Sequence, residues 1–269
     1  MTNLTRRFDS SSIATIGMVH LRPLPGTPRS TQSPEEIASK AAQEAQVLAE
    51  AGFDAVLVEN MHDLPYLLRS VGPEIVASMT LATKAVVDAV TIPVGVQILA
   101  GANHAAIAVA HAAGAQFIRA EGFAYASVAD EGIFAEADAG PLLRYRRAIG
   151  AEHIAIWADV RKKHSAHALT ADLSIADLVS GTHFAGADAV IVTGPHTGSP
   201  ASDVDIDAAR AASPLPVMVG SGVTSESLPG LLNRASGVIV GSTLKVDGRW
   251  ENELDPASIS RFIKARHGH

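Results

Sequence analysis

The sequence predicts an α/β protein that folds as a single (β/α)8 TIM barrel. Short runs of β-branched and apolar residues alternate along the chain with longer segments in which apolar residues recur at helical spacing. About eight such runs occur, as a closed parallel barrel requires. The length of 269 residues also lies within the range of one barrel of this kind.

Each expected strand is a short apolar run followed by a polar or glycine-rich turn. In chain order, the expected strands cover residues 13–20, 55–59, 93–99, 115–119, 153–159, 187–193, 215–220 and 237–241. No proline- or serine-rich linker and no run of charges divides the chain. We therefore expect residues 13–269 to form one barrel domain, preceded by an N-terminal extension of residues 1–12.

The helix expected after the first strand has clear start and stop signals. Ser33 is a suitable N-cap, Pro34 suits the first helical position, and the acidic pair at 35–36 complements the helix dipole. Apolar residues from Ile37 to Leu48 then form one stripe, and Gly52 ends the segment. Further helices are expected after Pro73 and over residues 224–234 and 256–265.

A doubly wound open sheet has the same alternation of strands and helices and is the main alternative. A dinucleotide-binding sheet of that type carries a GxGxxG turn after its first strand, and none occurs at that place here. The closed barrel is therefore the preferred prediction.

Composition and charge exclude several classes of protein. Hydrophobic residues make up 47% of the chain, but no apolar run reaches the ~20 residues that cross a bilayer, so we expect no membrane span. The formal net charge of -7 disfavours a nucleic-acid partner, because binding to phosphate backbones depends on clustered Lys and Arg.

There is no cysteine for disulfides or thiolate metal sites. No signal-peptide pattern follows residues 1–12, which indicates a cytoplasmic protein, and assembly into a homo-oligomer is left open.

Glycine-serine turns follow the last two expected strands. Gly220, Ser221 and Gly222 follow the seventh strand, whereas Gly241 and Ser242 follow the eighth. In phosphate-binding barrels, backbone N–H groups at these two strand ends bind a phosphate dianion. Each turn alone is compatible with an ordinary chain reversal, but two at successive strand ends predict a phosphate site. We expect Gly222→Asp to block a phosphorylated ligand and to leave the fold intact.

Polar side chains also gather where the other expected strands end. Ionisable groups at such positions are costly to bury without a partner, and catalytic residues of barrels lie at the C-terminal ends of the strands. Each residue on its own is equally compatible with a helix cap or a structural ion pair. The residues concerned are His20, Glu59, Asn60, Gln97, Arg119, Glu121, Asp159 and Thr193.

Some of these side chains suit catalysis. Glu59 and Asp159 are candidates for proton transfer, because burial raises the pKa of a carboxyl group toward neutrality, and we expect both in one cavity. Arg119 suits a substrate carboxylate or phosphate through its planar fork. Lys163 and His164 are candidates for an acid, a base or an electrophile, with a solvated basic loop as the alternative. Glu121 completes the catalytic candidates, and His20, Asn60, Gln97, Thr193 and Gly194 join the two glycine-serine turns as expected substrate-binding residues.

No cofactor is firmly indicated by the sequence. His20, Glu59, Asp159 and His164 offer nitrogen and oxygen ligands for a divalent metal, which stays an alternative. No HxH or HExxH motif supports it.

Two strand-to-helix connections are long, over residues 121–140 and 160–174. Long connections in compact domains are usually functional or disordered, and both would lie on the catalytic face. We expect residues 121–140 to cover the barrel mouth as a lid. Residues 194–199, with a glycine at 194 and another at 198, resemble a substrate-covering loop or an ordinary turn-rich connection.

A set of short motifs resembles the BtpA/SgcQ family over nearly the whole chain. The motifs are residues 16–26 (IGMVHLRPLPG), 58–60 (VEN), 65–66 (PY), 117–119 (FIR), 192–194 (VTG), 219–223 (VGSGV), 240–242 (VGS) and 244–245 (LK). The resemblance implies a barrel of the ribulose-phosphate-binding type. Names within the family refer to photosystem I biogenesis, to a nucleoside triphosphatase and to a sugar operon, which imply no common reaction. Gln97 and the pair Ala120 and Glu121 depart from the pattern of photosynthetic members, which puts a shared substrate in doubt.

We therefore expect an enzyme that acts on a small phosphorylated sugar or nucleoside-like compound by general acid-base catalysis. The reaction would be an isomerisation or a bond cleavage at the C-terminal face of the barrel. The alternative is a non-catalytic assembly or biogenesis factor on the same fold, because fold alone does not separate the two.

Overall fold

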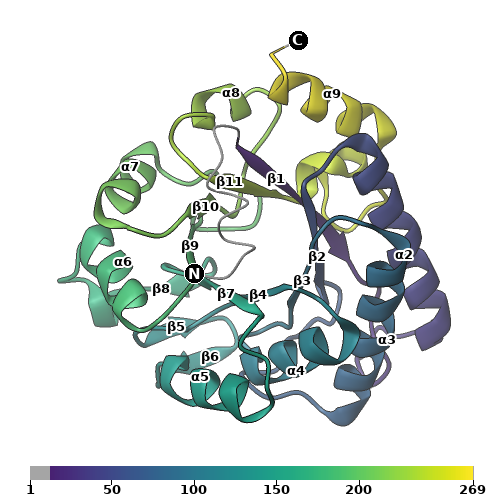
Figure 1. Cartoon of the computed structure of the whole chain (residues 1–269), viewed down its shortest axis with the longest axis horizontal. Coiled ribbons are helices and arrows are strands. Elements are labelled where there is room, and N and C mark those ends of the chain that lie inside the picture. Colours follow the sequence, from purple (N-terminus) through teal and green to yellow (C-terminus); the bar gives the residue numbers. More distant parts are fainter. Residues whose placement is uncertain (1–12, 269) are drawn as a thin grey trace.

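Eight parallel strands close into a barrel in the order β1-β11-β10-β9-β7-β4-β3-β2 (Figure 1). The structure is a computed structural model that describes residues 13–268, so the expected N-terminal extension of residues 1–12 lies outside the described residues. The barrel prediction is confirmed. The strands are β1 (Ala14–His20), β2 (Ala55–Glu59), β3 (Val94–Gln97), β4 (Phe117–Ala120), β7 (Ala155–Asp159), β9 (Ala189–Val192), β10 (Val217–Val219) and β11 (Gly237–Val240).

Helices form the outer layer around the barrel (Figure 1). The start of the first helix follows from its sequence, because Ser33 and Glu36 each accept a hydrogen bond from the other's backbone N–H. Gly52 ends the helix in the left-handed region, at φ 100°. The helices are α2 (Pro34–Ala51), α3 (Pro73–Ala89), α4 (Asn103–Ala113), α5 (Ala139–Ala148), α6 (Ile175–Phe184), α7 (Asp203–Ala212), α8 (Leu228–Leu231) and α9 (Pro256–Arg266).

Helix α8 is much shorter than the predicted helix over residues 224–234. Thr224 and Ser227 bond to each other's backbone N–H, which offers the chain a turn in place of a helix. Pro229 lacks an N–H and Gly230 has a low helix propensity, so only one turn forms.

The barrel interior is filled because side chains alternate between the two faces of each strand. Phe117 of β4 stacks on Trp157 of β7, with ring centroids 4.0 Å apart. Gly95 of β3 leaves room for this stack, since a Cβ there would lie 2.2 Å from the Phe117 ring. The interior residues are Ala14, Ile16, Met18, Ala55, Leu57, Phe117, Ala155, Trp157, Ala189, Ile191, Met218 and Ile239.

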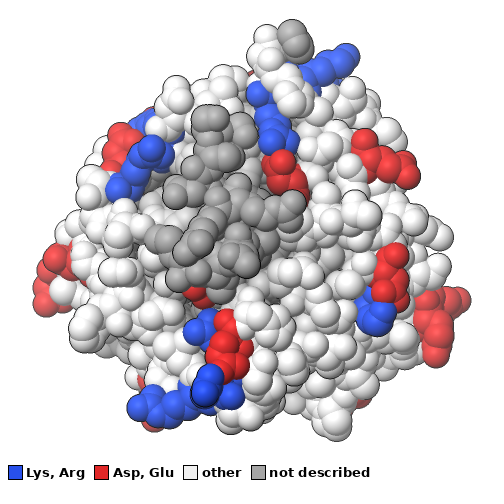
Figure 2. Space-filling view, viewed as in Figure 1, with Lys and Arg blue, Asp and Glu red and all other residues white. Residues whose placement is uncertain are grey.

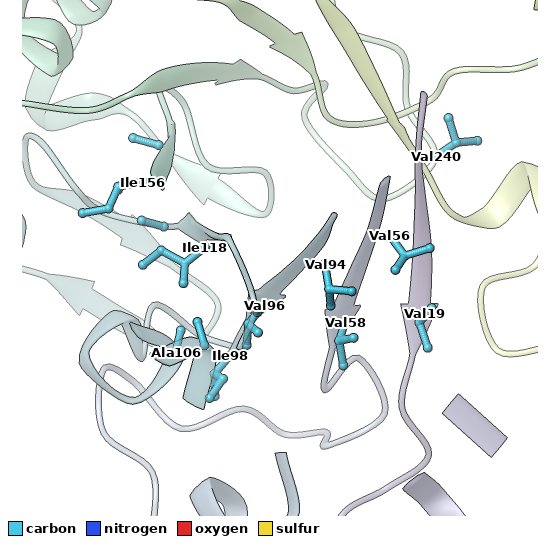
Figure 3. Packing of buried hydrophobic residues seen from close by; sticks show 14 of the residues in the cluster. Val19, Val56, Val58, Val94, Val96, Ile98, Ala106, Ile118, Ile156 and Val240 are labelled. Atoms are coloured by element: carbon cyan, nitrogen blue, oxygen red, sulfur yellow. The ribbon is translucent and has the colours of Figure 1, made fainter. Parts of the chain in front are cut away.

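The intervening residues point outward and pack against the helices (Figure 3). Figure 3 shows valines and isoleucines of neighbouring strands in this layer, with Ala106 of α4 beside Ile98. Because each strand is buried on both faces, it reads as a continuous apolar run, and the first polar interior side chains occur where the strands end.

The two long connections are joined by a small sheet. Strands β5 (Ser127–Ala129), β6 (Gly132–Phe134) and β8 (Ser165–Ala166) form three antiparallel strands in the order β6-β5-β8. Residues 121–140 therefore contain regular structure rather than a plain loop, and their role as a lid stays a prediction.

The molecular surface in Figure 2 carries Lys and Arg mixed with Asp and Glu in small groups near the rim. No broad patch of one sign is visible on the part of this face that grey atoms leave uncovered. None of the described helices is long and apolar enough to cross a membrane.

Candidate functional site

A cleft with two adjoining lobes opens at the C-terminal ends of the strands. The first lobe has a volume of about 250 Å³ and the second about 320 Å³. They share four lining residues, namely Glu59, Met61, Lys163 and Thr197. A single ligand that occupies both lobes would therefore pass beside Glu59 and Lys163.

The glycine-serine turns that follow β10 and β11 meet in the first lobe. Gly220, Ser221 and Gly222 line it from one side, and Gly241 and Ser242 line it from the other. Ser242 begins a single 3-10 turn over Ser242–Leu244, whose first backbone N–H groups have no acceptor within the turn. The lobe thus combines glycine backbone, which lets a ligand approach closely, with N–H and hydroxyl donors.

The Ser221 side chain fixes the connection after β9. Its hydroxyl accepts from the N–H of Gly194 at 2.7 Å and donates to the carbonyl of Ser199 at 2.9 Å. Gly222 has φ 65°, and a Cβ there would lie 2.3 Å from the backbone N of Pro200. Gly222→Asp would therefore disturb this packing, and our expectation that this variant leaves the fold intact is wrong.

Glu59 and His20 form a buried pair at the floor of the first lobe. They are register partners at the ends of β1 and β2, and His20 Nε2 lies 3.5 Å from Glu59 Oε2. Burial lowers the pKa of His20 well below its ordinary value, and Lys245 lowers it further. Burial also raises the pKa of Glu59, although Lys163 and Arg119 oppose this shift. The pair therefore joins a neutral imidazole to a carboxyl group that binds its proton more tightly than usual.

Arg119 and Asp159 form a buried bidentate ion pair between β4 and β7. Arg119 Nε and Nη2 each donate to one Asp159 oxygen, both at 2.9 Å. Arg119 lines the first lobe, whereas Asp159 lines neither lobe. Only Glu59 of the two expected carboxylates thus opens into the cleft, and Asp159 instead holds Arg119 in place.

Lys163 lies where the two lobes meet. Burial and the neighbouring Arg119 lower the pKa of Lys163, while Glu59 acts in the opposite direction. No described acidic residue forms an ion pair with Lys163, in contrast to its neighbour Lys162. Its ammonium group is therefore held near Glu59 without being neutralised by a direct contact.

The second lobe contains a cluster of Glu121, Glu131 and Lys162. Lys162 Nζ lies 3.1 Å from Glu131 Oε2 and 3.9 Å from Glu121 Oε1. Burial raises the pKa of Glu121 to about 7, with Lys162 opposing and Asp159 adding to the shift. Oε2 of Glu121 is buried and has no hydrogen-bond partner among the described residues. Glu121 thus contributes to the lobe wall a buried carboxyl group that titrates near neutral pH and has one oxygen without a described partner.

His164 lies in the second lobe, on the loop after β7. The backbone N–H of Thr197 donates to its Nε2 at 3.2 Å, while Nδ1 lies 3.7 Å from Asp130. His164 has φ 56°, a conformation that is uncommon for a residue other than glycine. Burial lowers the pKa of His164, although Asp130 opposes this effect.

Four expected binding residues lie outside the lining of both lobes. Asn60 donates to Asp63 and accepts from the N–H of Leu99, both at 2.8 Å. Thr193 donates to the carbonyl of Arg161 at 2.7 Å, and Gly194 is held by Ser221. Gln97, the register partner of Glu59, is buried and neither end of its amide has a described partner. Asn60, Thr193 and Gly194 thus position the loops and the barrel rim rather than the cleft wall, whereas Gln97 makes no described contact that would give it such a role.

The four residues considered as metal ligands are not gathered at one point. His20 and Glu59 pair in the first lobe, Asp159 is bonded to Arg119, and His164 lies in the second lobe. Within residues 13–268, no group of three or more His, Asp and Glu side chains is arranged to hold a metal ion.

Sequence reasoning missed most of the second lobe. Met61, Leu64, Pro65, Tyr66, Leu99, Glu131 and Trp250 line it without having been candidate site residues. They lie in connections, where no periodic pattern reveals which side chain turns inward. Pro65 and Tyr66 carried a signal as part of a family motif, and Glu131 lies within the expected lid over residues 121–140.

The sequence matches the BtpA family over residues 11–268. The chain belongs to the BtpA family. A mitochondrial protein of Caenorhabditis elegans, described as uncharacterized, is 45% identical to it over 97% of this chain and 95% of the worm protein. The photosystem I biogenesis protein BtpA of Synechocystis is 39% identical over 93% of this chain and 86% of that protein. Because the worm protein is named as mitochondrial, the expected cytoplasmic location stays a prediction.

Solved structures show the same fold at low sequence identity. Phosphoribosylanthranilate isomerase from Pyrococcus furiosus has a TM-score of 0.58 at 13% identity, covering 96% of this chain and 100% of that one. The N-acetylmannosamine-6-phosphate 2-epimerase from Clostridium perfringens has a TM-score of 0.55 at 13% identity, covering 88% and 89%. At these identities the likeness establishes the barrel fold.

Asp159→Asn should destabilise the protein by about 3–5 kcal/mol, because it leaves the buried charge of Arg119 without its partner. Urea unfolding monitored by circular dichroism measures this loss. Glu152→Gln, which breaks the exposed pair with Arg147, is the control and should leave stability unchanged. Equal stability of wild type and Asp159→Asn would show that the pair does not hold Arg119.

The raised pKa of Glu121 should make the protein less stable as the pH rises from 4.5, the ordinary pKa of a glutamate, to about 7, its pKa in the folded state. Over this interval the folded state keeps the proton and the unfolded state loses it, so the unfolded state binds fewer protons and stability falls. The Glu121→Gln variant should not show this pH-dependent loss of stability, because glutamine does not titrate. Its free energy of unfolding minus that of wild type should grow by on the order of 3 kcal/mol between about pH 5 and about pH 7.5. A constant difference across this range would contradict the raised pKa.

Proposed function

We propose that this protein is an enzyme that acts on a small phosphorylated sugar or nucleoside-like compound by general acid-base catalysis. The observation that carries the proposal is the meeting of the two lobes at Glu59 and Lys163. A carboxyl group and an amine lie there with pKa values that burial displaces toward neutrality from opposite sides. Such groups exchange protons efficiently near neutral pH.

The phosphate would occupy the first lobe. Backbone N–H groups of the glycine-serine turns and the Ser242 hydroxyl supply neutral donors, and Lys163 supplies an uncompensated positive charge. Barrels with this arrangement of turns after the last two strands commonly bind phosphate there. The solved neighbours support the idea by analogy, since their names refer to a phosphoribosyl compound and to a sugar 6-phosphate.

The acid and base would act on the part of the substrate between the lobes. Glu59 as the carboxylate removes a proton from a carbon or hydroxyl group, and Lys163 in its protonated form donates a proton to the oxygen or nitrogen on which negative charge develops. Arg119 stabilises that charge from the floor of the lobe, and Asp159 keeps its guanidinium oriented. The neutral His20 imidazole positions Glu59. These steps serve an isomerisation or the cleavage of a C–O, C–N or C–C bond.

A non-catalytic role in assembly is the second candidate. It is favoured by the name of the Synechocystis relative, a photosystem I biogenesis protein. A scaffold has no need for a buried carboxyl group and a half-buried, unpaired lysine in one cleft, which is why the enzymatic role is preferred.

Ser242→Asp should weaken the binding of inorganic phosphate at least tenfold, because it places a negative charge in the first lobe. Isothermal titration calorimetry with inorganic phosphate measures the effect. Thr31→Asp adds the same charge at an exposed position outside both lobes and serves as the control. Phosphate binding that is equal in wild type and Ser242→Asp would place the anion elsewhere.

Glu59→Gln and Lys163→Met should each lower turnover by about 10²–10⁴-fold, the usual contribution of general acid-base catalysis. Turnover is followed by NMR on a panel of sugar phosphates and nucleotides, and circular dichroism confirms folding. Glu74→Gln, a change on α3 outside both lobes, is the control. Full activity in both active-site variants would refute the catalytic assignment. Absence of turnover by wild type on every phosphorylated compound that it binds would favour the assembly role.

A further inference from the structure

We propose that the second lobe binds a flat nitrogen-containing ring, which is joined through a sugar to the phosphate in the first lobe. The ligand class is that of the 5′-mononucleotides and related phosphoribosyl compounds. This inference rests on the proposed function and narrows its substrate class.

The walls of the second lobe are apolar and aromatic. Trp250 is half-buried and packs against the cluster that contains Met61 and Leu99. The Tyr66 hydroxyl donates to the carbonyl of Met61 at 2.7 Å, which fixes the orientation of its ring. Leu64 completes the wall near Tyr66. Aromatic and apolar surfaces of this kind bind flat rings well.

One polar side chain of the same lobe, that of Glu121, has an oxygen without a hydrogen-bond partner among the described residues. Both oxygens of Glu131 accept from Lys162, at 3.1 and 3.3 Å, so Glu131 is already paired. Oε2 of Glu121 is buried and has no described partner. A buried acceptor without a donor is costly, and an N–H group on the edge of a ring would satisfy it. The lobe thus combines apolar and aromatic walls with carboxylate acceptors, a pattern that suits a nitrogen heterocycle with N–H groups on its edge.

The charges of the two lobes determine which end of the ligand lies in which lobe. Glu59 is the single acidic residue in the first lobe, among the lining residues that the structure describes, and Arg119 and Lys163 lie beside it. The second lobe adds three acidic residues, Glu121, Asp130 and Glu131, against one further cation, Lys162, which Glu131 pairs with. The acidic excess disfavours a phosphate there. The phosphate therefore belongs in the first lobe and the ring in the second.

The size of the cleft agrees with this assignment. A volume of about 250 Å³ accommodates a phosphorylated sugar, and about 320 Å³ accommodates a ring with its substituents. The bond between ring and sugar would lie near the shared residues Glu59 and Lys163, where protons can be moved to or from either side of it.

Isothermal titration calorimetry on the full chain tests the inference with four kinds of probe. They are inorganic phosphate, ribose 5-phosphate, the 5′-monophosphates of adenosine, guanosine, cytidine and uridine, and unphosphorylated adenosine. We expect at least one mononucleotide to bind tenfold or more tightly than ribose 5-phosphate, and adenosine to bind more weakly than its monophosphate.

Variants of second-lobe residues test whether this lobe is the source of the tighter binding of the mononucleotide. Trp250→Ala and Glu121→Leu should each abolish most of the tenfold advantage of the mononucleotide, while Trp250→Phe, which keeps an aromatic face, should retain it. Unchanged binding of ribose 5-phosphate by the same variants shows that the first lobe, and hence the fold, is intact.

Two results would overturn the inference while the proposed function stands. One is equal affinity for ribose 5-phosphate and all four mononucleotides, and the other is a mononucleotide advantage that survives Trp250→Ala or Glu121→Leu. Failure of wild type to bind phosphate, ribose 5-phosphate or any mononucleotide would instead overturn the proposed function, and the inference with it.

Discussion

Two parallel hydrogen bonds of 2.9 Å join Arg119 to Asp159 at the level where the barrel interior changes from apolar to polar. One interior position earlier on the same strands, Phe117 and Trp157 stack and fill the barrel. A lone guanidinium at this depth would cost several kcal/mol, so the charge of Arg119 can lie under the cleft because Asp159 is bonded to it. The aromatic stack below and the ion pair above together form the floor of the cleft, and Glu59 lies beside it, paired with His20, where the two lobes meet.

The cleft above this floor has two chemically different halves. Turn backbone makes up much of the first lobe, with one carboxylate, whereas the second lobe has two large aromatic side chains and four carboxyl groups. Glu59 and Lys163 belong to both halves, and burial shifts the pKa of each toward neutrality. Glu59 and Lys163, which line both lobes, are thus also the groups of the cleft best suited to proton transfer.

The barrel could be predicted from the sequence because each strand is a short apolar run that ends at a polar or glycine-rich turn, and both signals lie within the strand's own residues. The same rule placed both Glu59 and Asp159 at strand ends, yet only Glu59 lines the cleft. The difference lies in the cross-strand neighbour, and the register between β4 and β7 that brings Arg119 to Asp159 is not written in either strand alone. Trp250 and Tyr66 lie in connections, where no period indicates which side chain faces inward.

The small sheet of β5, β6 and β8 joins two connections that are distant along the chain. One connection carries Glu131 and the other carries Lys162, and the backbone N–H of Asp130 donates to the carbonyl of His164 at 3.3 Å. An insertion or deletion in either connection would shift the strand pairing and with it the residues contributed by the other. The two segments therefore form a single structural unit, and a redesign of this lobe that changes the length of one connection needs a matching change in the other.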